Sequence, residues 1–275
     1  MENEQRIGVR LVYYGLVCSK KNNKRAVRNR KTGQLGLVSS HIARANEEDI
    51  IRSFVMQRPR YKIPSPVVVT IDIYEPNYTR RDLDNQTATI FDALTKAGII
   101  EDDSINHVIE FWTRLAGFDK NAPRAVVHVE HKTWTAIPEN EYQSGMRLVY
   151  YGLVHSKKNS KRVIRNRKTG QLGIITSRVA KESEDDMIRQ FSLQRPSHMA
   201  PSPVTVSVDM YEPNRARRDL DNQSTSILDA LTRARIIEDD SIRHVTGIHG
   251  RLAGFDKKMP RAVVYVSDPK QECAC

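Results

Sequence analysis

The sequence is poor in cysteine. It has three cysteines among 275 residues, too few for the disulfide framework that holds small secreted proteins together. Cys273 and Cys275 form a C-x-C tail, where a solvated terminus is favoured over half of a zinc site because no second ligand pair lies nearby. The shortage of cysteine argues against a disulfide scaffold and favours a reducing, intracellular compartment.

Long hydrophobic runs are also missing. No apolar run approaches the roughly 18 residues that a membrane-spanning helix needs. The start of the chain, residues 1–6, is polar and has no signal-peptide core. We therefore expect no association with a membrane.

What the chain does have is a long internal repeat. Residues 10–130 align with residues 147–267 without a gap, and about two-thirds of the paired positions are identical. Solenoid repeats have periods of about 20–50 residues, so this much longer period indicates a duplicated domain. The division we predict is a first copy at 1–131, a polar linker at 132–145, a second copy at 146–267 and a C-terminal tail at 268–275.

The hydrophobic pattern of one copy predicts an α+β domain with a small mixed sheet packed with helices. Ile90, Ala93, Leu94 and Ala97 recur at helical spacing and form one buried stripe, and Gly98 is suited to end that helix. The elements we expect in the first copy are strands at 10–18, 67–74, 108–112 and 125–129, helices at 42–56 and before Gly98, and a loop at 114–120.

The basic residues are concentrated in one segment of each copy. The formal net charge is +11, and a cluster of lysines and arginines between Lys20 and Lys31 recurs in the second copy. Such a loop or hairpin is often only a solvated surface, but retention of its charges in both copies favours phosphate contacts. The absence of an amphipathic apolar face disfavours a membrane surface. The residues we expect to contact a polyanion are Lys20, Lys21, Lys24, Arg25, Arg80, Arg81, Lys157, Lys158, Lys161, Arg162, Arg217 and Arg218.

Each copy also contains two groups of carboxylates. Asp82 and Asp84 lie just before the predicted helix, and the Glu-Asp-Asp run at 101–103 follows it. Hard divalent cations such as Mg²⁺ bind oxygen ligands and need only a few protein carboxylates beside substrate phosphates, while Asn85 is suited to orient a ligand or a water. The alternative is that Asp84 caps the helix and the acidic run forms a polar turn. The distance between the two ends of the helix stays open.

For two further carboxylates, Asp92 and Asp72, the sequence allows two interpretations each. Asp92 follows Asp84 on the same helix, where it either binds the cation or, as we favour, pairs with an arginine. Asp72 lies in the predicted strand 67–74 and faces either toward the site or away from it, because alternate side chains of a strand point to opposite faces.

At these residues the sequence resembles the RusA family of Holliday-junction resolvases. The resemblance is carried by residues 81–85 (Arg-Asp-Leu-Asp-Asn), 91–98 (Phe-Asp-Ala-Leu-Thr-Lys-Ala-Gly), 102–103 (Asp-Asp) and the basic loop at 21–25, and it extends through essentially a whole copy. Members of this family are small homodimers that use Mg²⁺, with Mn²⁺ as a possible substitute, to nick opposing strands of a four-way DNA junction. The resemblance implies that the metal-binding and catalytic residues are Asp82, Asp84, Asp103, Asp219, Asp221 and Asp240. The residues expected around them are Asn85, Asn222, Asp102 and Asp239.

The resemblance also gives the duplication a purpose. A fused dimer would carry two active sites about an intramolecular pseudo-two-fold axis, which matches a two-fold-symmetric junction and requires no further oligomerisation. One position departs from the family pattern, because a catalytic lysine is usual where this chain has Ala88 and Thr225. Losing a cation that stabilises phosphoryl charge typically costs orders of magnitude in rate.

The sequence therefore predicts an Mg²⁺-dependent, structure-selective DNA endonuclease that resolves branched DNA in the cytoplasm or at the nucleoid. The first alternative is a junction-binding protein that has lost turnover together with the lysine. A further alternative is a basic RNA-binding or regulatory protein, which would need exposed aromatic platforms for base stacking. The candidates for such platforms are Tyr13, Tyr14, Tyr61 and Trp112, and the last two are histidines in the second copy.

Overall fold

The structure is a computed structural model. It describes residues 7–19, 24–28, 35–137, 145–156, 161–165 and 172–269, with backbone alone for 24–28, 35–39, 161–165 and 172–176. In this part of the chain, no helix is long and apolar enough to cross a membrane.

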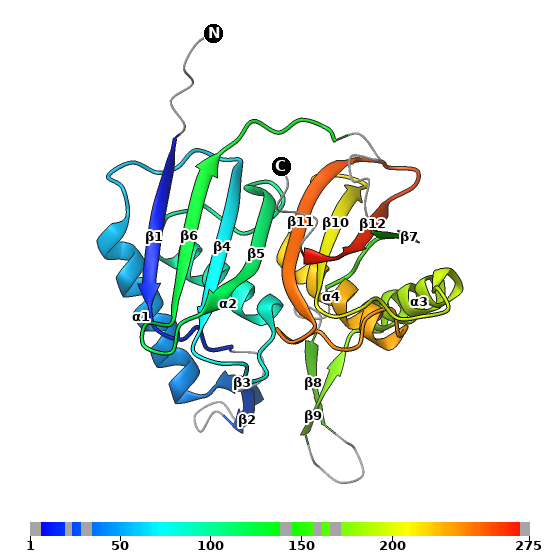
Figure 1. The fold of residues 1–275 in the computed structure, drawn as a ribbon, viewed down its shortest axis with the longest axis horizontal. Helices are drawn as coiled ribbons and strands as arrows, with labels where there is room; N and C mark the ends of the chain where they lie inside the picture. The colour runs from blue at the N-terminus through cyan, green and yellow to red at the C-terminus, as the bar shows by residue number, and fades with distance from the viewer. Residues whose placement is uncertain are drawn as a thin grey trace.

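One mixed sheet of eight strands runs through both halves of the molecule (Figure 1). Its strands, in spatial order, are β1 (Gly8–Tyr14), β6 (Arg124–His131), β4 (Val67–Glu75), β5 (Val108–Phe118), β11 (Val245–Phe255), β10 (Val204–Glu212), β12 (Arg261–Ser267) and β7 (Met146–Tyr151). Within each half, the pairing is parallel between β4 and β5 or β10 and β11, and antiparallel elsewhere. The predicted α+β class is confirmed.

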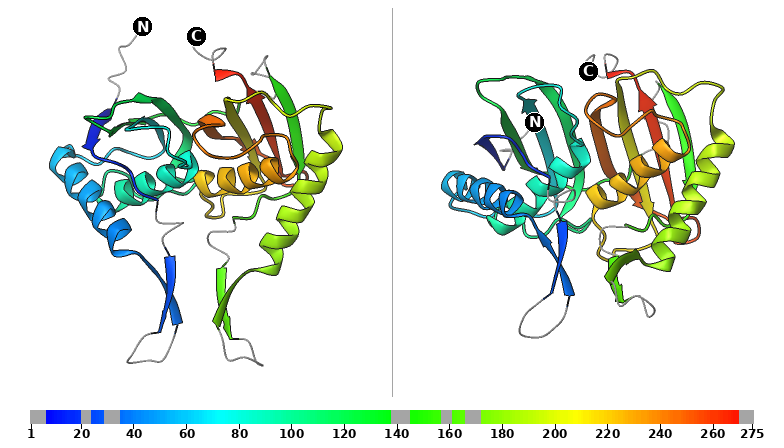
Figure 2. Two further views of the ribbon diagram at one scale, coloured as in Figure 1. Left: turned by 60° about the horizontal axis from the view of Figure 1, so that its bottom comes forward. Right: turned by 90° about the horizontal axis from the view of Figure 1, so that it is seen from below.

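Four helices pack on one face of this sheet (Figure 2). They are α1 (His41–Gln57), α2 (Leu83–Lys96), α3 (Arg178–Gln194) and α4 (Leu220–Arg233). The stripe predicted on α2 is buried, since Ile90, Ala93, Leu94 and Ala97 are all at most 1% exposed. Gly98 follows this helix with a φ of +69°, the left-handed conformation that commonly ends a helix at glycine.

The two halves of the sheet join edge to edge. Strand β5 pairs antiparallel with β11, from Arg114 opposite Gly247 to Glu110 opposite Arg251. An unpaired edge strand presents free backbone N–H and C=O groups, and this junction satisfies them along both inner edges. The expectation of two separate small sheets is thus replaced by one continuous sheet.

Strand β5 also extends further than the sequence predicted. The segment 114–120 was expected to be a loop, but β5 continues to Phe118 because it stays paired with β4, through a register shift after Ile73, until Phe118 lies opposite Glu75. The following turn is held by the backbone bond from Asp119 N to Glu75 O. This extension fixes the carboxyl end of β4, where the chain turns toward the acidic motif.

Two hairpins project from the same side of the molecule, away from the sheet (Figure 2). One is formed by β2 (Lys24–Arg28) and β3 (Leu35–Ser39), the other by β8 (Lys161–Arg165) and β9 (Leu172–Thr176). The loop-or-hairpin prediction for the basic segments thus matches the backbone of these residues.

The described part of the predicted linker lies against the second half. Trp134 Nε1 donates to Leu252 O at 2.8 Å, and Ile137 N donates to Ala253 O at 2.9 Å. The Trp134 ring also contacts the ring of Phe255, with centroids 5.5 Å apart. Residues 132–137 are therefore docked along β11, whereas 138–144 lie outside the described residues.

Candidate metal centre at the junction of the two halves

Each acidic motif, residues 81–85 in the first copy and 218–222 in the second, lies at the start of the helix that follows β4 or β10. After β4 the chain makes a turn, and α2 begins at Leu83 with Asp82 as its N-cap residue. The Asp82 side chain makes no capping hydrogen bond and instead accepts from Asn85 Nδ2 at 2.8 Å. In the second half, Asp219 stands in the same place before α4 and accepts from Asn222 Nδ2 at 2.8 Å. The N-cap position of α2 is therefore occupied by Asp82 and not by Asp84, which lies in the first turn of the helix, so the alternative interpretation of Asp84 as the cap is wrong.

The two acidic segments of one copy lie at opposite ends of a helix. Helix α2 has 14 residues, which corresponds to a length of about 21 Å. The turn that follows α2 then runs along the second half, where Ser104 forms an antiparallel bridge with Asp219 and Ile105 N donates to Arg218 O at 2.8 Å. The Glu-Asp-Asp segment of the first copy is thus positioned by the acidic motif of the second.

The reciprocal contact has the same form. Asp82 forms an antiparallel bridge with Ser241, and Ile242 N donates to Arg81 O at 2.8 Å. Helices α2 and α4 pack against each other, and each also contacts the seam strand of the other half, α2 against β11 and α4 against β5. Backbone hydrogen bonds and helix packing therefore tie each acidic motif to the opposite copy.

As a result, the carboxylates gather across the two copies. Asp102, Asp103 and Asp219 each offer an oxygen, and these oxygens all lie within 4.8 Å of one another. No other group of three such ligands meets this criterion among the residues that the structure describes, so Asp82, Asp84 and Asp103 do not form one. We call the group of Asp102, Asp103 and Asp219 the second composite site.

On the other side of the seam, the charges of Asp82 and Asp84 act on Asp240. We call these three residues the first composite site, although their oxygens do not meet the 4.8 Å criterion. Burial, and then the charges of Asp82 and Asp84, raise the pKa of Asp240 to about 6. Burial and the charges of Asp219 and Asp102 likewise raise the pKa of Asp103 to about 6. Nearby like charges disfavour ionisation, and a bound cation would relieve this repulsion in both sites.

The donor set fits a hard divalent cation. It offers carboxylate oxygens, which Mg²⁺ prefers. In addition, the side-chain oxygens of Asn85 and Asn222 are buried without a hydrogen-bond partner. A buried polar atom without a partner is costly in a folded protein, and both atoms belong to the asparagines that bond Asp82 and Asp219. The residues present therefore suit an ion coordinated by oxygen.

The neighbouring carboxylates of the Glu-Asp-Asp segments have a different environment. Burial opposes ionisation of Asp102, but hydrogen bonds from Ser104 and the charge of Arg217 hold its pKa below the usual range. Arg217 lies 2.9 Å from Asp102 and 3.8 Å from Asp103. Arg80 makes the equivalent contact with Asp239 at 3.0 Å. Each Glu-Asp-Asp segment thus has one exposed arginine of the opposite copy beside it.

The predicted basic contacts fall into three groups. Arg80 and Arg217 are exposed beside the sites, at 68% and 71%. Arg81 and Arg218 are instead largely buried, and each pairs with a buried glutamate, an arrangement that favours a structural role over phosphate contact. Lys24, Arg25, Lys161 and Arg162 lie in the projecting hairpins, whereas Lys20, Lys21, Lys157 and Lys158 lie outside the described residues.

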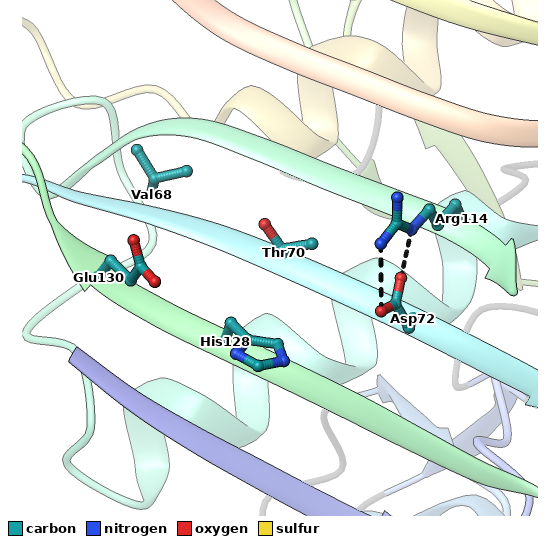
Figure 3. A pocket seen from close by; sticks show the side chains of 6 residues that line it. All are labelled: Val68, Thr70, Asp72, Arg114, His128 and Glu130. Carbon is teal, nitrogen blue, oxygen red and sulfur yellow. Dashed lines mark hydrogen bonds and ion pairs between the residues drawn. The ribbon is translucent and has the colours of Figure 1, made fainter. Parts of the chain in front are cut away.

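Asp72 and Asp92, for which the sequence leaves two roles each, also have distinct positions. Asp72 forms an ion pair with Arg114 on the face of the sheet opposite the helices (Figure 3), so it does not face the site. Asp92 lies close enough to Asp103 to contribute to its raised pKa, and Asp229 does the same for Asp240. Asp92 therefore lies close to the second composite site, and both cation binding and pairing with an arginine stay predictions for it.

Two glutamates at this centre were missed by the sequence reasoning. Glu75 and Glu212 end β4 and β10 and are buried at 0% and 2% exposure. The available signal was the retention of the Glu-Pro-Asn segment in both copies, which was interpreted only as the end of a strand. A charged residue at the end of a strand that leads to an acidic motif indicates a role at the site.

Comparison with known proteins agrees with this picture. A search among curated proteins found no match for the chain. Residues 18–130 match the model of the family described as endodeoxyribonuclease RusA. This stretch includes the first hairpin, the first acidic motif and the Glu-Asp-Asp turn that follows α2. Residues 18–130 of this chain belong to the RusA endodeoxyribonuclease family.

Proposed function

We propose that this protein is a divalent-metal-dependent endonuclease that resolves four-way DNA junctions by paired nicking. The observation that carries the proposal is the group of Asp102, Asp103 and Asp219, whose oxygens lie within 4.8 Å of one another across the two copies. The family of residues 18–130 supplies the reaction class, cleavage of DNA. The net charge of +11 suits a polyanionic substrate.

The duplication supports a junction rather than a plain duplex as the substrate. The strand order of the sheet places equivalent strands at equal distances from the β5–β11 seam. This arrangement supports the proposal of a pseudo-two-fold dimer within one chain, formed by copies at 1–131 and 146–267. A four-way junction has two-fold symmetry, so two related sites match two symmetric strands.

The residues of each composite site have separate tasks. Asp82, Asp84 and Asp240 would hold Mg²⁺ or Mn²⁺ in the first composite site. In the second, Asp103 and Asp219 would hold the ion together with Asp221, while Asp102 pairs with Arg217. When bound, such an ion polarises the phosphoryl oxygen and lowers the pKa of a water molecule. Asn85 and Asn222 orient the carboxylates that they bond, and Asp102 and Asp239 hold the neighbouring arginines.

The arginines beside the sites compensate in part for the absent lysine. The helix positions where a lysine is usual are occupied by Ala88 and Thr225. Arg80 and Arg217 are exposed and lie within 3.0 Å of site carboxylates, so each is available to contact the scissile phosphate. The basic hairpins extend the contact surface along the DNA arms.

The rival function is a junction-binding protein without turnover, which the absence of the lysine favours. Both functions predict tight binding to four-way DNA, so the assay must detect nicking. Cleavage of a synthetic four-way junction is measured with titrated Mg²⁺ or Mn²⁺. We expect paired nicks that the double substitution Asp84→Asn and Asp221→Asn abolishes while binding persists.

A matched control removes a carboxylate elsewhere. Asp72→Asn changes β4 on the face of the sheet opposite the helices, and we expect it to leave nicking unchanged. Binding of the wild-type protein without any nick at saturating Mn²⁺ would refute the enzyme and establish the rival.

A further inference from the structure

A buried carboxylate lies behind each acidic motif. Glu75 is fully buried, and burial raises its pKa, while the Gln86 hydrogen bond and the Arg81 charge lower it. The same pattern recurs at Glu212. A charge is retained in a protein interior at a large desolvation cost, so this carboxylate requires an explanation beyond packing.

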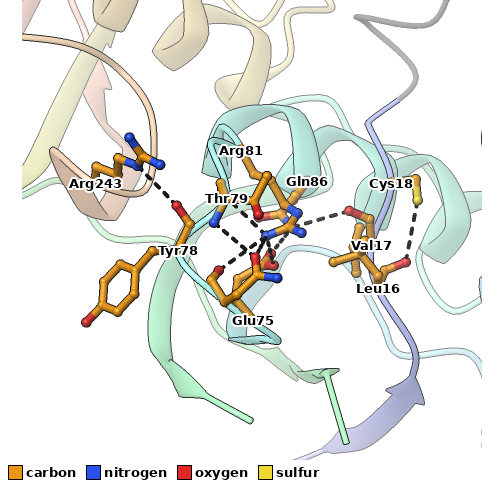
Figure 4. Close-up of polar contacts among 10 residues, drawn as sticks. Leu16, Val17, Cys18, Glu75, Tyr78, Thr79, Arg81, Gln86 and Arg243 are labelled. Carbon is orange, nitrogen blue, oxygen red and sulfur yellow. Dashed lines mark hydrogen bonds and ion pairs between the residues drawn. The ribbon is translucent and has the colours of Figure 1, made fainter. Parts of the chain in front are cut away.

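Glu75 connects three segments of the chain (Figure 4). Its Oε2 lies 2.8 Å from the Arg81 guanidinium, and its Oε1 accepts from Gln86 Nε2 at 2.5 Å. The same Gln86 nitrogen lies 3.3 Å from Val17 O, in the segment that leads from β1 toward the basic hairpin. One carboxylate thus links β4, the start of α2 and the base of the hairpin.

Arg81 transmits this link to the other copy. Its side chain is fixed by Glu75 and by long contacts of 3.4 Å to oxygens of Asn77 and Thr79. Its backbone oxygen accepts from Ile242 N at 2.8 Å, two residues after Asp240. Arg81 also directly precedes Asp82. The residue that Glu75 holds is therefore the one that sets Asp82 against the opposite Glu-Asp-Asp turn.

The second copy repeats every element of this arrangement. Gln223 Nε2 donates to Glu212 Oε1 at 2.6 Å and to Val154 O at 3.2 Å. Arg218 lies 3.1 Å from Glu212 Oε2, and its backbone oxygen accepts from Ile105 N at 2.8 Å. Two independent copies with different neighbouring residues thus keep the same geometry.

We propose that Glu75 and Glu212 are positioning residues for the composite sites. Through Arg81 and Arg218, each sets the distance between its own acidic motif and the aspartate of the opposite copy. Through Gln86 and Gln223, each also bonds the segment at Val17 or Val154, which follows the edge strand β1 or β7. This inference rests on the proposed function and extends it to residues that do not touch the ion.

Mn²⁺ binding to the full-length protein tests the proposal without relying on activity. Titration calorimetry of the wild type should report two sites. Glu75→Gln removes the charge while it keeps the shape, and we expect it to weaken only the first composite site, by about 10- to 100-fold, as is typical when a partner of a metal ligand is removed. Glu212→Gln should weaken only the second.

Two controls separate positioning from general destabilisation. Asp72→Asn breaks another carboxylate–arginine pair on the same strand and should leave both affinities unchanged. Combining Glu75→Gln with Arg81→Gln should be no worse than the stronger single change, because both act through one contact. If Glu75→Gln fails to fold, Gln86→Met tests the same link and should weaken the first site alone.

Opposite outcomes are also defined. Unchanged Mn²⁺ affinity in folded Glu75→Gln, or equal weakening of both sites, would overturn the positioning role while the proposed function stands. A wild-type protein that binds no Mn²⁺ would overturn this inference together with the proposed function. Failure of this inference alone is therefore seen in the Glu75→Gln variant, whereas failure of the proposed function is seen in the wild-type protein.

Discussion

The two halves share their sites but differ on the opposite face of the sheet. In the first half, this face is open and polar, and a pocket there is lined by Val68, Thr70, Asp72, Arg114, His128 and Glu130 (Figure 3). The equivalent residues of the second half are Thr205, Ser207, Asp209, Arg251, Tyr265 and Ser267, and all of them are buried. The linker contributes to the burial of this face in the second half, because Trp134 and Ile137 donate hydrogen bonds to β11.

The difference shows that a repeated sequence repeats its local geometry but not its surroundings. Asp72 and Arg114 form an ion pair in which the arginine is 56% exposed. The equivalent pair of Asp209 and Arg251 is 1% and 8% exposed. Equivalent substitutions on this face should therefore have unequal effects on stability, whereas equivalent substitutions in the composite sites should have equal effects on ion binding.

The largest expected inequality concerns this repeated ion pair. Arg251→Met leaves Asp209 buried without its cation, which typically costs about 3–5 kcal/mol. Arg114→Met breaks a pair whose arginine is exposed to solvent, and solvent-exposed pairs contribute about 0–1 kcal/mol. Urea unfolding of the two variants measures the difference. Equal losses of unfolding free energy would show that the second half is no better covered than the first.

A smaller effect is expected at the linker. Trp134→Ala removes a half-buried ring and the hydrogen bond to Leu252 O, at a cost on the order of 2 kcal/mol. The loss should be accompanied by faster amide exchange in β11 and not in β5. Unchanged exchange in β11 would contradict the role of the linker as a cover. Trp112→Ala removes the stack with His249 at the β5–β11 seam. It is the comparison variant, because it also removes a tryptophan ring but leaves the linker unchanged.

The effect that should differ least between the two halves is the pH dependence set by Asp103 and Asp240. Their pKa values are raised from 3.8 to about 6, so the folded protein keeps protons that the unfolded chain has lost. Without metal, stability should therefore fall as the pH rises from about 4 to about 6. Because the ion requires the deprotonated form, added Mg²⁺ should raise Tm more at pH 7 than at pH 5.

Substitution at each site checks that dependence. Asp103→Asn and Asp240→Asn should each remove a similar part of the Mg²⁺-induced rise in Tm. A rise that is independent of pH in the wild type, or one that only a single substitution reduces, would break the equivalence of the two sites.

Much of the fold followed from local patterns. The stripe on α2 and the β-branched run of β4 predict their elements because burial on one face or in one strand leaves a period in the sequence. The seam between β5 and β11 has no such signal, since it joins residues that are far apart in the chain. The predicted end of β5 at residue 112 was wrong for the same reason, because pairing with β4 extends the strand.

The candidate site was predictable as a set of residues but not as a grouping. Retention of Asp82, Asp84 and Asp103 in both copies marks them as special, yet a repeat does not reveal which copy completes which site. Helix α2 separates the two acidic segments of one copy, and the partner segment comes from the other half. Glu75 was missed because its partners, Arg81 and Gln86, are identified only by their contacts.

The central claim is that each site is completed by the opposite copy, and two double substitutions test it directly. Asp103→Asn with Asp219→Asn changes one composite site, whereas Asp82→Asn with Asp103→Asn changes both. We expect the first variant to bind one Mn²⁺ ion per chain and the second variant to bind none. The reverse result, no ion for the first variant and one for the second, would contradict sites shared between the copies.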